Sequence, residues 1–221
     1  RPKTNAVARM FCDIIPPSGE SFDGDPRSVL RRNLERAAEH GYTYYVAPEV
    51  EYFYFKDSHG TEPLDQGGYF DQDPQDLATN LRRETVLNLE ELEIPVVFSH
   101  HEVAPSQHEI DLRHTDALTM ADMLMTCRVV IKEIAMKNGC HATFMPKPIF
   151  GINGSGMHTH QSLYKGQVNA FYDEDDQDHL SDDAKWFIAG LLRHACEITL
   201  VTNQWVNSFK RLVQSPDRAP L

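Results

Sequence analysis

A glycine-rich turn followed by alternating polar residues is the stretch of this sequence best suited to chemistry. It spans residues 153–162 and reads NGSGMHTHQS. Side chains two residues apart on a strand share one face, so His158, His160 and Ser162 are expected to project together. Glycine lets the preceding backbone approach a ligand closely. His158 is the best histidine candidate for a metal ligand, whereas His160 and Ser162 are better placed for a neighbouring phosphate.

Two other stretches offer carboxylates that could complement these histidines. Glu49 and Glu51 share one face of a predicted strand, and Glu102 and Glu109 flank a short segment that contains His108. Core-like residues surround the first pair on both faces, where carboxylates are costly unless a cation pairs them. Four carboxylates and a histidine predict a two-metal site for Mg²⁺ or Mn²⁺. The oxygen-rich set argues against Zn²⁺ with its usual Cys/His shell.

Plainer interpretations of these residues stay open. The two glutamate pairs could be ordinary polarity on a strand and a loop. His100 and His101 are better explained as residues that support a ligand than as ligands themselves. Lys210-Arg211 could be a surface pair or, in an otherwise acidic site, the anion clamp for a carboxylate substrate.

Composition narrows the class of protein. The 221 residues are 41% hydrophobic and 24% charged, which is ordinary for a globular domain with one sizeable core. A formal net charge of −12 disfavours nucleic acid or an anionic membrane as a partner. The four cysteines lie far apart and are expected to be free, mostly buried thiols in a reducing compartment. Neither a signal peptide nor a membrane-length apolar run is recognisable, so we expect a cytoplasmic protein.

Hydrophobic periodicity and turn residues predict strands that alternate with helices. Such an order could form a doubly wound α/β sheet. However, polar residues occupy one whole face of several strands, which a sheet covered on both sides would not tolerate. We therefore predict an α+β fold with a curved antiparallel β-sheet, helices on its outer face and the polar site on its concave face. Strands are expected over residues 8–15, 44–55, 95–98, 107–113 and 142–145, and helices from residues 25, 73, 116 and 181, the last extending to Ile198.

An ordered series of motifs covers nearly the whole chain. The segments Lys147-Pro148 and Gly156-Met157-His158 are the most distinctive of them. Together they resemble glutamine synthetase of the bacterial and archaeal type. The resemblance implies a partly closed antiparallel sheet and assembly into large homo-oligomeric rings. The motifs are Phe22–Arg27, Pro48–Phe53, Gly67–Asp71, Ser99–Pro105, Gln107–Asp111, Ala142–Pro148, Asn153–Leu163 and Val206–Val213.

The resemblance implies a reaction and a set of metal ligands. In this family ATP phosphorylates the γ-carboxylate of glutamate, and ammonia then displaces phosphate. Metal ions neutralise charge on the transferring phosphoryl group and on the attacking carboxylate. By motif, Glu51, Glu102 and Glu109 resemble the ligands of one metal, and Glu49 and His158 resemble two ligands of the other.

The same resemblance assigns substrate positions. Asn153 and Gly154 match the loop that holds glutamate, and Arg211 matches the arginine that binds the glutamate side. His160 and Ser162 match positions on the nucleotide side. Glutamate, ammonia and ATP are the substrates and co-substrate that this match implies.

The sequence departs from the family pattern in three places. The family continues Pro-Gly-Tyr-Glu-Ala-Pro after the Arg-Leu-Val motif, and that glutamate takes a proton from ammonium. Residues 214–220 are one residue longer and lack it; Asp217 could substitute as a catalytic residue, although Arg218 beside it disfavours ammonium. Val97 stands where a glutamate is usual, and His114 where an aromatic residue is usual.

The extent of the match leaves alternatives open. The resemblance implies that residues 1–221 are a truncated catalytic domain without the family's N-terminal β-grasp-like domain and C-terminal part. One metal could then be fully ligated, while the other would be short of a carboxylate. The alternatives are a related ligase that joins glutamate to a larger amine, a catalytically incomplete metal-binding fragment, and a His-x-His metal oxygenase. The glycine-rich lead-in disfavours the oxygenase.

Overall fold

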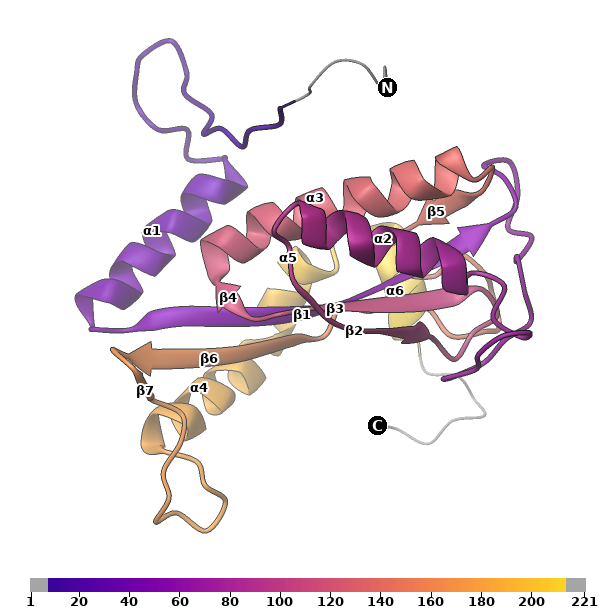
Figure 1. The fold of residues 1–221 in the computed structure, drawn as a ribbon. Helices are drawn as coiled ribbons and strands as arrows, with labels where there is room; N and C mark the ends of the chain where they lie inside the picture. Colours follow the sequence, from indigo (N-terminus) through magenta and orange to yellow (C-terminus); the bar gives the residue numbers. More distant parts are fainter. Residues whose placement is uncertain (1–7, 214–221) are drawn as a thin grey trace.

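One long strand, β1 (Thr43–Phe55), organises the sheet in this computed structural model, which describes residues 8–213 (Figure 1). Strands β3, β4, β5 and β6 all pair with it in antiparallel fashion. The main path of the sheet is β2-β3-β1-β6-β7, and the sheet is curved. The predicted curved antiparallel sheet is thus confirmed. The other strands are β2 (Val96–His101), β3 (Gln107–Leu112), β4 (Thr115–Asp116), β5 (His141–Thr143), β6 (Thr159–Lys165) and β7 (Val168–Asn169).

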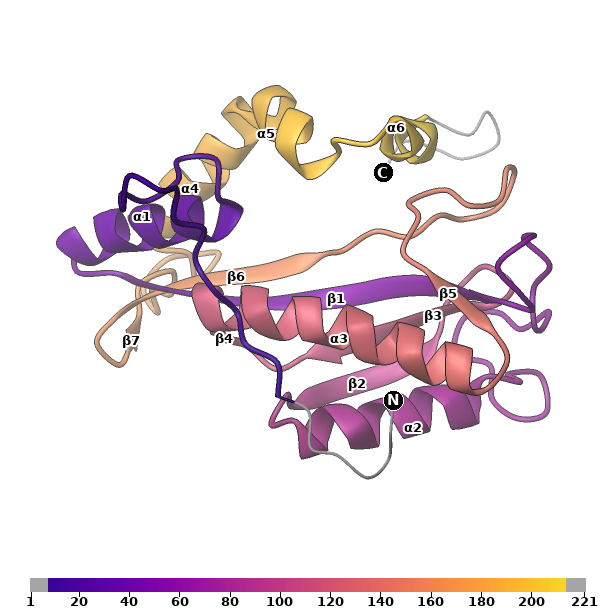
Figure 2. The same ribbon diagram turned by 90° about the horizontal axis from the view of Figure 1, so that it is seen from above.

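Three helices begin where the sequence predicts a helix start, at residues 25, 116 and 181. Asp25, Asp116 and Ser181 each accept a hydrogen bond from a backbone N–H in the first turn that follows. Helices α2 and α3 cover one face of the sheet, whereas α4, α5 and α6 lie on the side of β6 (Figure 2). The helices are α1 (Pro26–Glu39), α2 (Thr79–Glu91), α3 (Ala117–Lys137), α4 (Asp182–Arg193), α5 (Ala195–Thr202) and α6 (Val206–Leu212).

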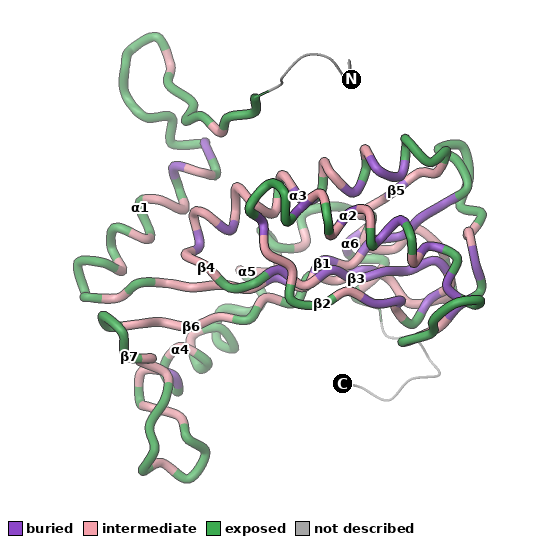
Figure 3. Tube along the Cα trace, in the orientation of Figure 1, coloured by how far each residue is buried: buried purple, intermediate pink, exposed green. Residues whose placement is uncertain are grey.

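The alternation of side chains along β1 separates two hydrophobic clusters. Tyr52 and Tyr54 pack in the larger cluster, which includes residues of α2 and α3. Phe53 and Phe55 point to the opposite face, where Ile149 and Ile152 of the loop after β5 pack against them. Burial is therefore concentrated where β1 and β3 meet α2 and α3 (Figure 3). Glu51 and Glu49 lie on the same face of β1 as Phe53, further toward the start of the strand.

The predicted strand over residues 8–15 is wrong. This segment has no regular secondary structure, and Met10 is 82% exposed. An apolar run becomes a strand only where another strand offers hydrogen-bond partners. Here the segment is instead held at the start of α1, because Asp13 pairs with Arg27 at 2.7 Å and also contacts Arg31.

Two predicted helix boundaries are also wrong. The last helix does not run unbroken to Ile198, because His194, with φ −105° and ψ 16°, separates α4 from α5. Ile188 of α4 is 43% exposed. The helix expected from residue 73 begins at Thr79 instead. There, Asp76 accepts a hydrogen bond from the N–H of Ala78, and such local bonds compete with a helix.

Two predictions from composition can be compared with the structure. Among residues 8–213, no helix has both the length and the apolar content that a membrane crossing would require. The four cysteines are free, as expected, but Cys12 and Cys196 are exposed rather than buried.

Candidate active site

Strand register brings acidic side chains from β1 and β3 onto one face of the sheet. Glu51 lies directly opposite Glu109, and Glu49 lies opposite Asp111. On the other side of β3, His100 of β2 lies opposite Glu109. Directly opposed residues on antiparallel strands share a face with Cβ atoms about 5 Å apart. The register therefore places four carboxylates and an imidazole in two adjacent rows.

His100 lies between two of the predicted metal ligands. Its Nε2 atom is 3.3 Å from Glu109 Oε1, and its Nδ1 atom is 3.8 Å from Glu102 Oε1. Ligand atoms of His100, Glu102 and Glu109 all lie within 4.8 Å of one another, close enough to hold one metal ion. His100 was expected to support a ligand, and this geometry suits either a supporting or a ligating role.

Glu51 connects the acidic rows to the glycine-rich loop. Its Oε2 atom accepts hydrogen bonds from Gln107 Nε2 at 2.9 Å and from the N–H of Gly156 at 3.0 Å. Gln107 also donates to the carbonyl oxygen of Gly154 at 3.1 Å. A Cβ atom at Gly156 would lie 3.4 Å from Glu51 Oε1 and 3.6 Å from Arg211 Nη1. The absence of a side chain at Gly156 therefore lets the loop backbone approach both groups.

Glu49 is held by both predicted histidines. His158 Nδ1 lies 3.0 Å from Glu49 Oε2, and His160 Nε2 lies 2.5 Å from Glu49 Oε1. His158 precedes β6, and its carbonyl oxygen accepts the N–H of Glu49. Ser162 lies two residues further along β6, opposite Tyr45. His160 and His158 thus both contact Glu49, and the place of His160 beside a phosphate stays a prediction.

The electrostatics of the acidic rows favour a bound cation. Burial, followed by repulsion from Asp111, Glu51 and Glu102, raises the pKa of Glu109 to about 9. Burial is also the main cause of the raised pKa of Glu51 and of Asp111. Glu49 behaves differently. Burial alone would raise its pKa, but hydrogen bonds from His160 and His158 outweigh burial and lower it. Burial and mutual repulsion therefore disfavour ionisation of Glu51, Glu109 and Asp111, and a bound cation would offset that cost.

The remaining predicted substrate residues lie beside this site. Arg211 of α6 borders a cavity of about 890 Å³ that Glu51 and Gly156 also line. Asn207 of α6 attaches this helix to the loop between β5 and β6. Its side chain accepts a hydrogen bond from the N–H of Lys147 at 2.7 Å and donates one to the carbonyl oxygen of Lys147 at 2.9 Å. Asn153 is half-buried in the same loop. Asp217 lies outside the described residues.

Comparison with known proteins identifies the family. Residues 23–220 match the family model named glutamine synthetase, catalytic domain. The chain belongs to the glutamine synthetase family. It is 56% identical over 211 residues to glutamine synthetase of Mycobacterium bovis, an alignment covering 94% of this chain and 47% of the relative. It is 52% identical over 217 residues to that of Methanosarcina mazei, covering 96% and 48%.

The solved structures of a glutamine synthetase and of a protein described as GmaS share this fold. Plasmodium falciparum glutamine synthetase matches with a TM-score of 0.83 and 30% identity, covering 90% of this chain and 46% of that chain. A structure described as apo GmaS without ligand matches with a TM-score of 0.83 and 33% identity, covering 90% and 48%. The chain thus spans about half the length of the relatives it matches. The roles assigned to individual site residues stay predictions.

Gly154 gives a direct test of how tightly this glutamine synthetase loop is packed. A Cβ atom at Gly154 would lie 2.2 Å from the backbone oxygen of Pro146, so the loop would have to move. We expect Gly154→Ala to lower the free energy of unfolding by about 2 kcal/mol. The matched control is Gly190→Ala, because a Cβ there meets nothing within 4 Å and Gly190 lies in α4. That change should stabilise the helix by up to about 1 kcal/mol. Urea unfolding of both variants measures the difference, and equal stabilities would contradict the prediction.

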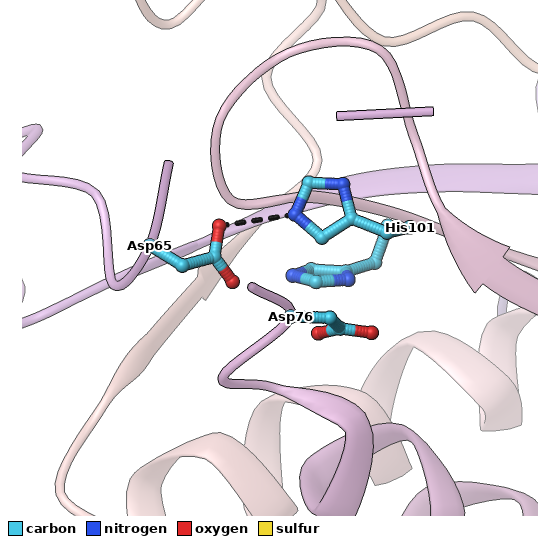
Figure 4. Close-up of side chains that lie close together, drawn as sticks. Asp65, Asp76 and His101 are labelled. Atoms are coloured by element: carbon cyan, nitrogen blue, oxygen red, sulfur yellow. Dashed lines mark hydrogen bonds and ion pairs between the residues drawn. The ribbon is translucent and has the colours of Figure 1, made fainter. Parts of the chain in front are cut away.

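A second cluster of titratable residues lies beneath the site and went unnoticed in the sequence. Asp65, Asp76, His101 and His108 are buried, and their ligand atoms lie within 4.8 Å of one another (Figure 4). By residue type they could hold a metal ion. However, Arg82 Nη1 donates to Asp76 Oδ2 at 2.5 Å and lies 3.0 Å from His108 Nδ1. A guanidinium therefore already occupies the cationic position.

His101 provides the second positive charge of this cluster. Its Nε2 atom lies 3.0 Å from Asp65 Oδ1, and its Nδ1 atom lies 2.7 Å from the carbonyl oxygen of Glu102. Both partners only accept hydrogen bonds, so the ring donates from both nitrogens and is an imidazolium. Two carboxylates are thus balanced by one guanidinium and one imidazolium. We interpret the cluster as a structural network. No short motif signals it, because Asp65 and Asp76 lie in a segment without periodicity.

Proposed function

We propose that this chain supplies catalytic-domain residues of an ATP-dependent ligase that joins ammonia to the γ-carboxylate of glutamate through γ-glutamyl phosphate. The observation that carries the proposal is that Glu51 lies opposite Glu109 in the sheet, while ligand atoms of Glu109, Glu102 and His100 lie within 4.8 Å of one another. In the proposal, residues 1–221 are part of a longer catalytic domain. The protein would act in the cytoplasm as a homo-oligomer, with no nucleic-acid or membrane partner.

The donor set fits hard divalent cations. Carboxylate oxygens with raised pKa values and one imidazole are ligands that suit Mg²⁺ or Mn²⁺. Glu51, Glu102 and Glu109 would hold one ion, and Glu49 and His158 would contribute to the second. When bound, the ions would neutralise charge on the transferring phosphoryl group and on the attacking carboxylate.

The protein's own groups would bind and orient the organic substrates. Arg211 lines the cavity next to Glu51, where its guanidinium could pair with a carboxylate of glutamate. Asn153 and Gly154 would form the loop beside it. On the opposite side of Glu49, His160 and Ser162 would face ATP. A role for Asp217 in taking a proton from ammonium rests on the sequence alone.

Formation of γ-glutamyl hydroxamate tests the proposal. The purified chain would be incubated with glutamate, ATP, hydroxylamine and Mn²⁺, beside a Glu102→Ala control. We expect product from the unsubstituted chain and at least tenfold less from the control, because loss of a charged group in phosphoryl transfer costs orders of magnitude in rate.

Two further outcomes would redirect the assignment. The altered sequence of residues 214–220 favours a related γ-glutamyl-amine ligase as the second candidate. A higher rate with a primary amine or polyamine than with ammonia would support that candidate. A folded chain that binds Mn²⁺ but forms no product with any amine would instead be a catalytically incomplete metal-binding fragment.

A further inference from the structure

A single buried carboxylate ties together three segments next to the proposed metal ligands. Asp65 is 5% exposed. Its Oδ1 atom accepts from Ser106 N at 2.9 Å, from His101 Nε2 at 3.0 Å and from Gly67 N at 3.3 Å. Its Oδ2 atom accepts from Leu77 N at 3.1 Å. One side chain thus links the loop before α2, the end of β2 and the turn between β2 and β3.

The turn between β2 and β3 also accepts hydrogen bonds from the segment that carries Asp65. Ser106 Oγ accepts from the N–H of Leu64 at 2.5 Å and from that of Asp65 at 3.1 Å. Ser106 adopts φ 58°, a left-handed conformation that is uncommon for a residue with a side chain. Its carbonyl oxygen also accepts from the N–H of Tyr54 on β1 at 3.0 Å. The reciprocal bonds hold the turn in a conformation that it would not favour alone.

His101 transmits this restraint to Glu102. Its ring is held between Asp65 on one side and the carbonyl oxygen of Glu102 on the other. Gly67 packs against the same ring so closely that a Cβ there would lie 2.8 Å from His101 Nε2. The His101 ring is fully buried, so no water replaces these partners. The peptide that carries the Glu102 side chain is therefore fixed from the buried side of the sheet.

We propose that Asp65, acting through His101, positions the Glu102 carboxylate for metal binding. Asp65, His101 and Ser106 form what we call the Asp65 clamp. None of the three is proposed as a ligand or as a catalytic residue. The inference rests on the proposed metal site at Glu51, Glu102 and Glu109. Residues that orient ligands from behind typically change metal affinity by 10–100-fold when they are replaced.

The first test compares two buried aspartates in the full chain. Asp65→Asn keeps the size of the side chain, but its NH₂ group would face N–H donors that the carboxylate of Asp65 accepts from. We expect the dissociation constant for Mn²⁺, measured by electron paramagnetic resonance, to rise about tenfold. Asp25→Asn is the matched control, because Asp25 is 4% exposed and likewise accepts from backbone and hydroxyl donors, but at the start of α1. This control should lose stability without losing Mn²⁺ affinity.

Two substitutions of His101 each remove one link of the clamp. Asparagine can place its amide near the position of Nδ1, so His101→Asn keeps a donor for the Glu102 carbonyl. Glutamine can place its amide near the position of Nε2, so His101→Gln keeps a donor for Asp65 only. Each variant therefore breaks one of the two links between Asp65 and Glu102, so we expect both to bind Mn²⁺ about tenfold more weakly than the unsubstituted chain. If Asp65→Asn does not fold, the two His101 variants test the clamp in its place.

The outcomes distinguish failure of the clamp from failure of the metal site. Wild-type Mn²⁺ affinity in Asp65→Asn, or in either His101 variant, would overturn the clamp alone. If the unsubstituted chain bound no Mn²⁺, or if Glu102→Ala bound it equally well, both the metal site and the clamp would be overturned. Loss of affinity in Asp25→Asn equal to that in Asp65→Asn would reduce the effect to general destabilisation and would also overturn the clamp.

Discussion

Replacing Glu51 by glutamine is expected to weaken Mn²⁺ binding by at least about 100-fold, which corresponds to about 3 kcal/mol. Glu51 lies opposite Glu109 in the sheet, and Glu102 contributes to its raised pKa. Loss of its charge removes a ligand from the centre of the site. The same substitution should raise the melting temperature of the metal-free protein by a few degrees, because it relieves repulsion among crowded carboxylates.

The two opposite effects make the Glu51 experiment informative. Calorimetric titration with Mn²⁺ measures the affinity, and thermal unfolding in the presence of a chelator measures the stability. Glu35→Gln is a suitable control, because Glu35 is an exposed glutamate of α1. It should change neither quantity. A Glu51→Gln variant that is less stable without metal would show that the carboxylate serves the fold, and unchanged Mn²⁺ affinity would remove Glu51 from the site.

The sheet and the acidic rows were predictable because a strand places side chains with a period of two. Glu49 and Glu51 therefore had to share a face once β1 was recognised from its aromatic and β-branched residues. The alternating sequence of β3 likewise placed Glu109 and Asp111 together. What the pattern did not supply was register. Only the structure pairs Glu51 with Glu109 and Glu49 with Asp111.

The Asp65 clamp shows what sequence reasoning misses. Its contacts join residues 36 to 42 positions apart, from segments with no common period. Hydrogen bonds from backbone N–H groups leave no residue-type signal at the donor position, because every residue but proline has one. The tertiary environment also explains why residues 8–15 do not form a strand, because no other strand within residues 8–213 pairs with this apolar run. Local pattern therefore predicted which carboxylates share a face of the sheet better than it predicted the buried residues that hold them in place.

The stability of the metal-free protein is expected to fall as the pH rises from about 5 to 9. Glu109 has a pKa of about 9 in the folded protein against 4.5 for an ordinary glutamate. Between these values the native state keeps a proton that the unfolded chain loses, so the slope of unfolding free energy against pH is negative. The contribution of Glu109 is fully present below pH 4.5 and is lost as the pH passes its folded pKa. Glu51 and Asp111, whose pKa values are also raised, act in the same direction.

Thermal unfolding at a series of pH values with a chelator present measures this effect. After allowance for partial solvation of the site, a loss on the order of 2 kcal/mol corresponds to a fall in melting temperature of about 5 °C. Glu109→Gln should flatten the curve, because its side chain carries no ionisable proton. Saturating Mn²⁺ should flatten it too, since the ion binds the ionised carboxylates and offsets their repulsion. If the metal-free Glu109→Gln variant kept the wild-type slope, the proton retained in the folded state would belong to another group, with Asp111 and Glu51, whose pKa values are also raised, the first to examine. A flat curve in the unsubstituted protein would mean that the acidic rows are compensated without a metal, which would remove the electrostatic argument for the site.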